Sequence, residues 1–234
     1  MTSPAGSNHL APRQLPQPPF RFYTERRLVE LTGRRARNLG ELLEHLQEVP
    51  GSSIFYHTHH QYLSHHFETP VFHNDFAGWV LRALRLEQLA ERLAAIDLLA
   101  FTSIRQLRRS IVSAIQDYLA EGGWQPQESP PGDEFHFCLS RSFVMPTGIV
   151  AGDEREFFAK LPGVTNVSLF FHFFLARLRL ERPTNDFSQW LGDLGHRELA
   201  KAIDRLDPYS RTLDELKADI LALGDAYLGS GDGR

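Results

Sequence analysis

Histidines gather more densely in one segment than anywhere else in the chain. Six of the eleven lie between residues 57 and 73, and neutral imidazole is the commonest side-chain ligand of transition metals. Helical residues three or four positions apart share a face. No HExxH pattern or cysteine ligand accompanies them. We predict a candidate metal site, with Zn, Fe or Mn as the ion, formed by His57, His59, His60, His66 and His172.

His172 belongs to this set because it occupies the place of His57 in a second, similar segment. It lies in the apolar stretch SLFFHFFLARL, where burial without a hydrogen-bond partner costs free energy. A core histidine bonded to a carboxylate, a carbonyl or His57 is therefore the alternative interpretation, and we favour it. The other histidines of the first segment then form a solvated helical face.

Two aspartates follow the histidines in a shared motif, N-D-F-x-x-W. They are Asp75 and Asp186. An aspartate at such a position most simply caps a helix, which is the interpretation we favour. The alternative is a carboxylate that fixes the tautomer of His57 or His172 beside a bound ligand.

Arginines form the third candidate site, just ahead of a predicted helix start. Free backbone N–H groups at a helix N-terminus favour anions, so a phosphorylated ligand or an acidic protein surface is the expected partner. An ordinary solvated surface is the alternative. The residues are Arg26, Arg27, Arg34, Arg35 and Arg37.

An internal repeat sets the elements that must position these residues. A shift of 115 places Phe20, Phe22, Thr32, Gly33, Glu41, Ser53, Phe55 and His57 on Phe135, Phe137, Thr147, Gly148, Glu156, Ser168, Phe170 and His172. The N-D-F-x-x-W motif and a closing Tyr-Leu recur with slightly smaller offsets. The order is kept throughout, and we therefore predict two diverged copies of one unit.

The predicted fold is mainly α, an internally duplicated helical unit packed as one pseudo-twofold body with at most short peripheral strands. Each copy should open with an extended Phe-x-Phe and a Thr-Gly turn, and its first helix should be capped by Asn38 or Asp153. The expected organisation is a disordered tail (1–19), copy one (20–119), a Pro/Gly-rich linker (120–134), copy two (135–228) and a flexible tail (229–234).

Composition narrows the function classes. The net charge of −4 provides no global attraction to nucleic acid or acidic membranes. No stretch of 18 apolar residues is present, so we expect no membrane span. The single cysteine, Cys138, is typical of a reducing compartment, and the expected location is the cytoplasm.

The combination of Phe-x-Phe, Thr-Gly, a capped helix, S-x-F-x-H and N-D-F-x-x-W resembles an uncharacterised prokaryotic family described only as a domain of unknown function. The resemblance covers residues 20–228 and implies no activity. Three hypotheses remain open. The first is a binding protein with a histidine-based metal or small-ligand site in or between the copies. The second is a structural or regulatory module that docks an acidic partner on the arginine segment, and the third is a metal-dependent enzyme.

Overall fold

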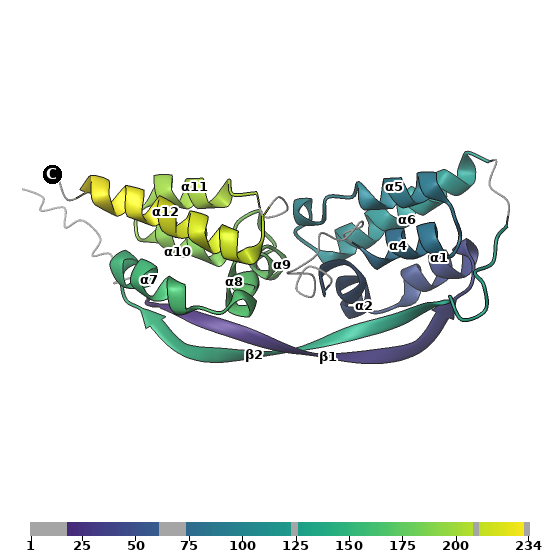
Figure 1. Ribbon diagram of the computed structural model, residues 1–234, viewed down its shortest axis with the longest axis horizontal. Coiled ribbons are helices and arrows are strands. Elements are labelled where there is room, and N and C mark those ends of the chain that lie inside the picture. The colour runs from purple at the N-terminus through teal and green to yellow at the C-terminus, as the bar shows by residue number, and fades with distance from the viewer. Residues whose placement is uncertain (1–17, 61–73, 123–125, 208–210, 232–234) are drawn as a thin grey trace, which may run out of the picture.

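The computed structural model describes residues 18–60, 74–122, 126–207 and 211–231. The described part of the chain forms two helical lobes that lie side by side above one long two-stranded ribbon (Figure 1). The ribbon consists of β1 (Phe20–Ala36) and β2 (Phe135–Ala151), paired antiparallel. The protein is therefore mainly helical, as predicted.

The first lobe contains the helices between the two strands. They are α1 (Leu39–Glu48), α2 (Gly51–Phe55), the π-helical turn η1 (Tyr56–His60), α4 (Asp75–Arg82), α5 (Glu87–Ala94), the 3₁₀ turn η2 (Leu98–Ala100) and α6 (Ile104–Ala120). The second lobe contains α7 (Glu154–Lys160), the 3₁₀ turn η3 (Leu161–Gly163), α8 (Asn166–Phe173), α9 (Leu175–Leu180), α10 (Asp186–Asp193), α11 (Arg197–Asp204) and α12 (Leu213–Gly231). No described helix is long and apolar enough to span a bilayer.

The prediction of at most short peripheral strands was wrong. Each strand has 17 residues, and the ribbon runs under both lobes (Figure 1). The strands escaped detection because most side chains beyond the opening aromatics are exposed or half-buried on both faces. A strand shows alternating hydrophobicity only where one face is buried.

The opening aromatics of β1 pack in the second lobe, and those of β2 pack in the first. Phe20 and Phe22 are buried in the core of the second lobe. Phe135 and Phe137 are buried in the core of the first. The apolar residues thus form two separate cores, and each core contains residues of both strands. The ribbon therefore connects the two lobes through their cores.

The Thr-Gly pairs are irregularities within the strands, not the turns we predicted. Gly33 has φ 78° and Gly148 has φ 83°, in the left-handed region that glycine tolerates best. The pairing register shifts there, between Leu31 and Arg35 on β1, as in a β-bulge. The Thr32 hydroxyl donates to the Phe137 carbonyl at 2.7 Å, and the Thr147 hydroxyl donates to that of Phe22 at 2.8 Å.

The predicted caps of the first helix in each lobe are confirmed. The Asn38 side chain accepts from the Glu41 N–H at 2.9 Å, and that of Asp153 accepts from the Glu156 N–H at 2.8 Å. The predicted tails lie largely outside the described residues, since 1–17 and 232–234 are not described. At the C-terminal end, α12 continues to Gly231, into the segment predicted to be flexible.

Candidate functional site

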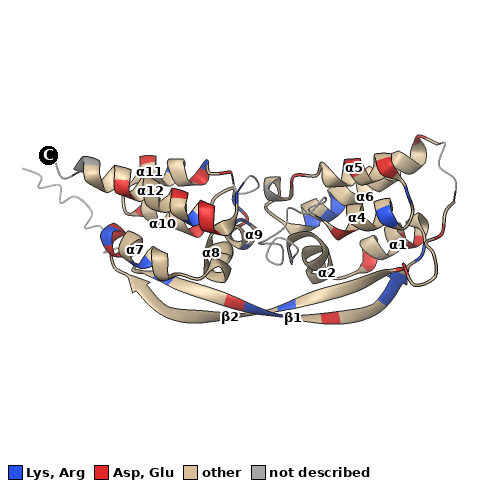
Figure 2. Cartoon of the chain, viewed as in Figure 1, with Lys and Arg blue, Asp and Glu red and all other residues tan. Residues whose placement is uncertain are grey.

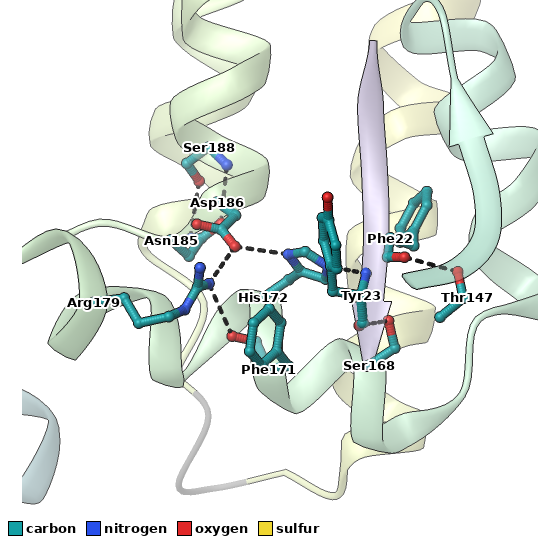
Figure 3. A network of polar contacts seen from close by, with 10 residues as sticks. All are labelled: Phe22, Tyr23, Thr147, Ser168, Phe171, His172, Arg179, Asn185, Asp186 and Ser188. Atoms are coloured by element: carbon teal, nitrogen blue, oxygen red, sulfur yellow. Dashed lines mark hydrogen bonds and ion pairs between the residues drawn. The ribbon is translucent and has the colours of Figure 1, made fainter. Parts of the chain in front are cut away.

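His172 lies near the end of α8 and is buried, with 3% of its surface exposed. Its Nδ1 faces the Asp186 carboxylate at 2.7 Å (Figure 3). The expectation of a buried histidine with a polar partner is thus confirmed, and of the three partners considered it is a carboxylate. The guanidinium of Arg179 lies 2.5 Å from the same carboxylate oxygen and stacks over Phe171. The carboxylate therefore joins a helix start to two side chains from the preceding helices.

The other ring nitrogen of His172 is also occupied. The backbone N–H of Tyr23, on β1, donates to Nε2 at 2.7 Å. The Ser168 hydroxyl donates to the carbonyl of the same Tyr23 at 2.6 Å (Figure 3). Because Nε2 accepts a hydrogen bond, the proton of the neutral ring must reside on Nδ1, facing Asp186. Two side chains of α8 thus bind both backbone groups of one strand residue.

The first lobe repeats this arrangement around His57. Its Nδ1 lies 2.9 Å from Asp75, and its Nε2 accepts the backbone N–H of Cys138, on β2, at 2.9 Å. His57 itself lies in the π-helical turn η1 and is 3% exposed. Both histidines therefore link a helix to the strand that comes from the other half of the chain.

The favoured interpretation of the aspartates was wrong. The helix caps are the preceding asparagines, since Asn74 accepts from the Ala77 N–H at 2.8 Å and Asn185 from the Ser188 N–H at 2.9 Å. Asp75 and Asp186 occupy the next position, where their carboxylates face the histidines. An asparagine cap leaves the following side chain free to reach a neighbouring helix, which explains why the motif needs both residues.

In both pairs the two ring nitrogens of the histidine already have hydrogen-bond partners. Burial lowers the pKa of His172, and the Asp186 carboxylate only partly opposes that effect. His57 and His172 also lie in separate cores, against Phe135 and Phe20 respectively. Neither ring has a free nitrogen to offer a ligand. Among the described residues, no group of three or more His, Cys, Asp or Glu side chains is placed to hold a metal ion.

The remaining predicted metal ligands do not join this pair. His59 is buried and stacks on Phe55 at 5.1 Å between ring centroids. Its Nδ1 lies 2.8 Å from the Thr58 hydroxyl, and burial lowers its pKa to about 4. His66 and the side chain of His60 lie outside the described residues. A metal site that uses them stays a prediction.

The five predicted anion-binding arginines are spread along β1 and its end. Three of them are engaged by different carboxylates, Arg27 by Glu25, Arg34 by Glu48 and Arg37 by Glu41. Each of these three guanidinium groups has its own carboxylate partner, so the three do not converge on one anion site. Arg26 and Arg35 are exposed, and no carboxylate of the described residues forms an ion pair with either.

Arg27 occupies the middle of the molecule. It pairs with Ser142 on β2, the residue 115 positions later, so two equivalent positions face each other there. Its guanidinium carbon lies 4.8 Å from the Phe55 ring centroid in the first lobe and 5.5 Å from that of Phe170 in the second. The side chain is 5% exposed. Arg27 thus fills the contact between the lobes, where sequence reasoning had placed a surface ligand site.

A hollow of about 340 Å³ beside β2 has one titratable side chain in its lining, Lys160. Its amino group donates to the Val150 carbonyl and to Glu156, both at 2.7 Å. No nucleophile–base pair lines this hollow, and nothing in it suggests a reaction.

Sequence reasoning missed the exposed apolar residues at the centre of the ribbon. They are Leu28, Val29, Leu31, Phe143, Val144 and Met145, each between 37% and 76% exposed. Large apolar side chains gathered on a surface mark interaction sites. The matched spacing could have indicated them, because Leu28 and Val29 align with Phe143 and Val144 at the same offset of 115 residues.

Comparison with known proteins places the chain among its relatives. A family of unknown function, DUF5752, matches residues 17–224. The chain belongs to this family. The DUF5752 chain is also similar to a solved structure, described as the structure of OrfY from Thermoproteus tenax, with 28% identity and a TM-score of 0.76. The match covers 89% of this chain and 94% of that one. No curated protein matches this chain.

Proposed function

We propose that this protein is a structural or regulatory interaction module that docks an acidic partner on its ribbon. The observation that carries the proposal is a separation of charge. Residues 20–36 contain five arginines and two glutamates, and residues 135–151 add one arginine. The ribbon therefore carries +4, and the rest of the chain must carry −8 to leave the net charge of −4. Figure 2 shows the basic bands where the strands cross and at the end of β1.

The placement of the apolar residues supports the same surface. Leu28 pairs with Arg141 and Phe143 with Arg26 across the two strands, so exposed apolar side chains and arginines form one patch there. Such a patch attracts an acidic surface over a distance and then holds it by burial of apolar area. His57 and His172, whose ring nitrogens are all hydrogen-bonded, offer no comparable support for an enzyme. The single cysteine, Cys138, is half-buried and unoxidised, which supports the cytoplasm as the proposed location.

Selection from a random peptide library tests this proposal. Phage-displayed twelve-residue peptides would be selected on the immobilised full-length protein at low salt. We expect the selected peptides to be acidic with apolar residues, and their affinity to fall as salt rises, because exposed charges are screened. Double replacement of Arg26 and Arg35 by alanine should weaken binding. Selection of neutral or basic peptides, or of none, would overturn the proposal.

We also propose that the chain is a duplication with a pseudo-twofold axis between Arg27 and Ser142. In support, β1 and β2 have bounds offset by 115 at both ends. The same offset maps the pairs Arg21↔Val150 and Tyr23↔Pro146 onto His136↔Arg35 and Cys138↔Leu31, register shifts included. A crystal structure in which the two halves failed to superpose would contradict this.

A further inference from the structure

The ribbon has two free edges, and the histidine contacts reveal which residues face them. In an antiparallel pair, alternate residues direct their backbone groups toward the partner strand and away from it. Tyr23 directs its N–H away from β2, toward His172, and Cys138 directs its N–H away from β1, toward His57. Tyr23 pairs with Pro146 and Cys138 with Leu31. The alternation between these pairs therefore leaves Val29 and Leu31 on β1, and Val144 and Pro146 on β2, facing outward.

Each helical lobe covers one edge and leaves the other open. In the second lobe, α8 binds the backbone of Tyr23 on β1, and in the first lobe His57 binds Cys138 on β2. The strand opposite each covered position is exposed instead. Leu31 is 76% exposed and Val144 is 51% exposed. None of the described residues is recorded as bonding to the outward backbone groups of Val29 or Leu31.

One residue distinguishes the two open edges. Pro146 on β2 occupies the position that Leu31 occupies on β1, 115 residues earlier. Proline has no N–H and cannot donate to an added strand, and natural proteins use it to block sheet edges. Leu31 keeps its N–H. The open edge of β1 can therefore accept a third strand, whereas the equivalent edge of β2 cannot do so at that position.

Charge indicates what kind of strand would bind. Arg26 and Arg35 are exposed on either side of Val29 and Leu31 on the same strand. A second copy of the ribbon would bring +4 against +4, which opposes self-pairing. An extended segment with acidic and apolar residues would match both the arginines and the exposed Leu28, Val29 and Leu31.

We propose that an extended acidic–apolar segment of a partner protein adds to the edge of β1 at Val29–Leu31 as a third, main-chain-bonded strand. The inference rests on the proposed function and specifies how the partner is recognised. Strand addition obtains affinity from backbone hydrogen bonds and specificity from alternate side chains. The Pro146 edge stays empty, so one segment binds per chain.

Replacement of single edge residues, with the selected acidic peptides as probes, tests the main-chain contact. Leu31→Pro removes one outward N–H, and Pro146 shows that the fold accepts proline at the equivalent position. We expect affinity to fall at least about tenfold, the equivalent of one lost hydrogen bond. Leu31→Val keeps the N–H and an apolar side chain, and should bind almost normally. Pro146→Leu should open the second edge, so that two peptides bind per chain by calorimetry.

The outcomes separate the two proposals. If Leu31→Pro binds as the parent does while the Arg26 and Arg35 replacements abolish binding, strand addition is wrong and the acidic docking surface survives. If none of the variants affects the selected peptides, both proposals fail. A Pro146→Leu variant that still binds a single peptide would show that this proline does not close the β2 edge.

Discussion

The two lobes share the contacts around their histidines but differ in the side chains that meet at the centre of the ribbon. His57 and His172 use the same atoms toward Asp75 and Asp186. At the centre, Glu25 and Arg27 of β1 occupy the places of Ser140 and Ser142 of β2. A residue on a twofold axis meets its own equivalent, and two buried arginines there would repel each other. In the duplication that we propose, the central positions therefore had to diverge.

The largest effect is expected from a substitution that breaks the contact between Arg27 and Glu25. Replacement of Arg27 by serine, the residue at the equivalent position 142, leaves the buried Glu25 carboxylate without its partner. We expect a loss of about 3–5 kcal/mol in the free energy of unfolding, measured by urea denaturation. Addition of Glu25→Ser recreates the serine pair of β2 and should restore much of that loss. A double variant no more stable than Arg27→Ser would contradict this account of the asymmetry.

The histidine pairs should respond alike in the two lobes. Replacement of His57 or His172 by alanine opens a cavity and removes the imidazole that bonds to an aspartate and to a strand N–H. Each variant should lose about 2–4 kcal/mol of stability. Elemental analysis of the same purified variants separates structure from metal binding. Unchanged stability with a lost metal ion would reverse our interpretation.

A pH-dependent difference is expected at His59, which Phe174 replaces in the second lobe. Burial lowers the pKa of His59 to about 4, and the charge of Arg27 acts in the same direction. The unfolded state then binds a proton at higher pH than the folded state does. The folded state is therefore fully stabilised with respect to His59 above about pH 6.5. As the pH falls toward 4, protonation of His59 in the unfolded state lowers the free energy of unfolding by about 3 kcal/mol. His59→Phe should remove this part of the acid sensitivity, seen in melting temperatures between pH 7 and pH 4.

The smallest effect compares the serines that precede the histidines. The Ser168 hydroxyl donates to the Tyr23 carbonyl at 2.6 Å, whereas the buried Ser53 hydroxyl has no hydrogen-bond partner recorded in the described structure. Ser168→Ala should therefore cost about 1 kcal/mol. Ser53→Ala should be neutral or slightly stabilising, because it removes a buried, unsatisfied polar group. Equal losses in thermal denaturation would show that the first lobe has an equivalent bond after all.

Several features followed from the sequence because they depend on neighbours along the chain. The caps at Asn38 and Asp153 need only the N–H groups of residues three positions later. The burial of His172 followed from its phenylalanine neighbours, and its need for a polar partner followed from burial. The offset of 115 residues, read from scattered identities, is also the offset between the two strands.

Tertiary structure alone decided which strand each helix binds and where Arg27 lies. Tyr23 meets His172, which is 149 residues away, and Cys138 meets His57, which is 81 residues away. Local pattern cannot specify such pairings, because they depend on the register of a ribbon in which most side chains are exposed or half-buried. The same exposure hid the strands and made a central arginine resemble a surface one. The sequence therefore indicated the matched spacing of the two segments, and only the tertiary structure showed that each histidine binds a strand from the other half of the chain.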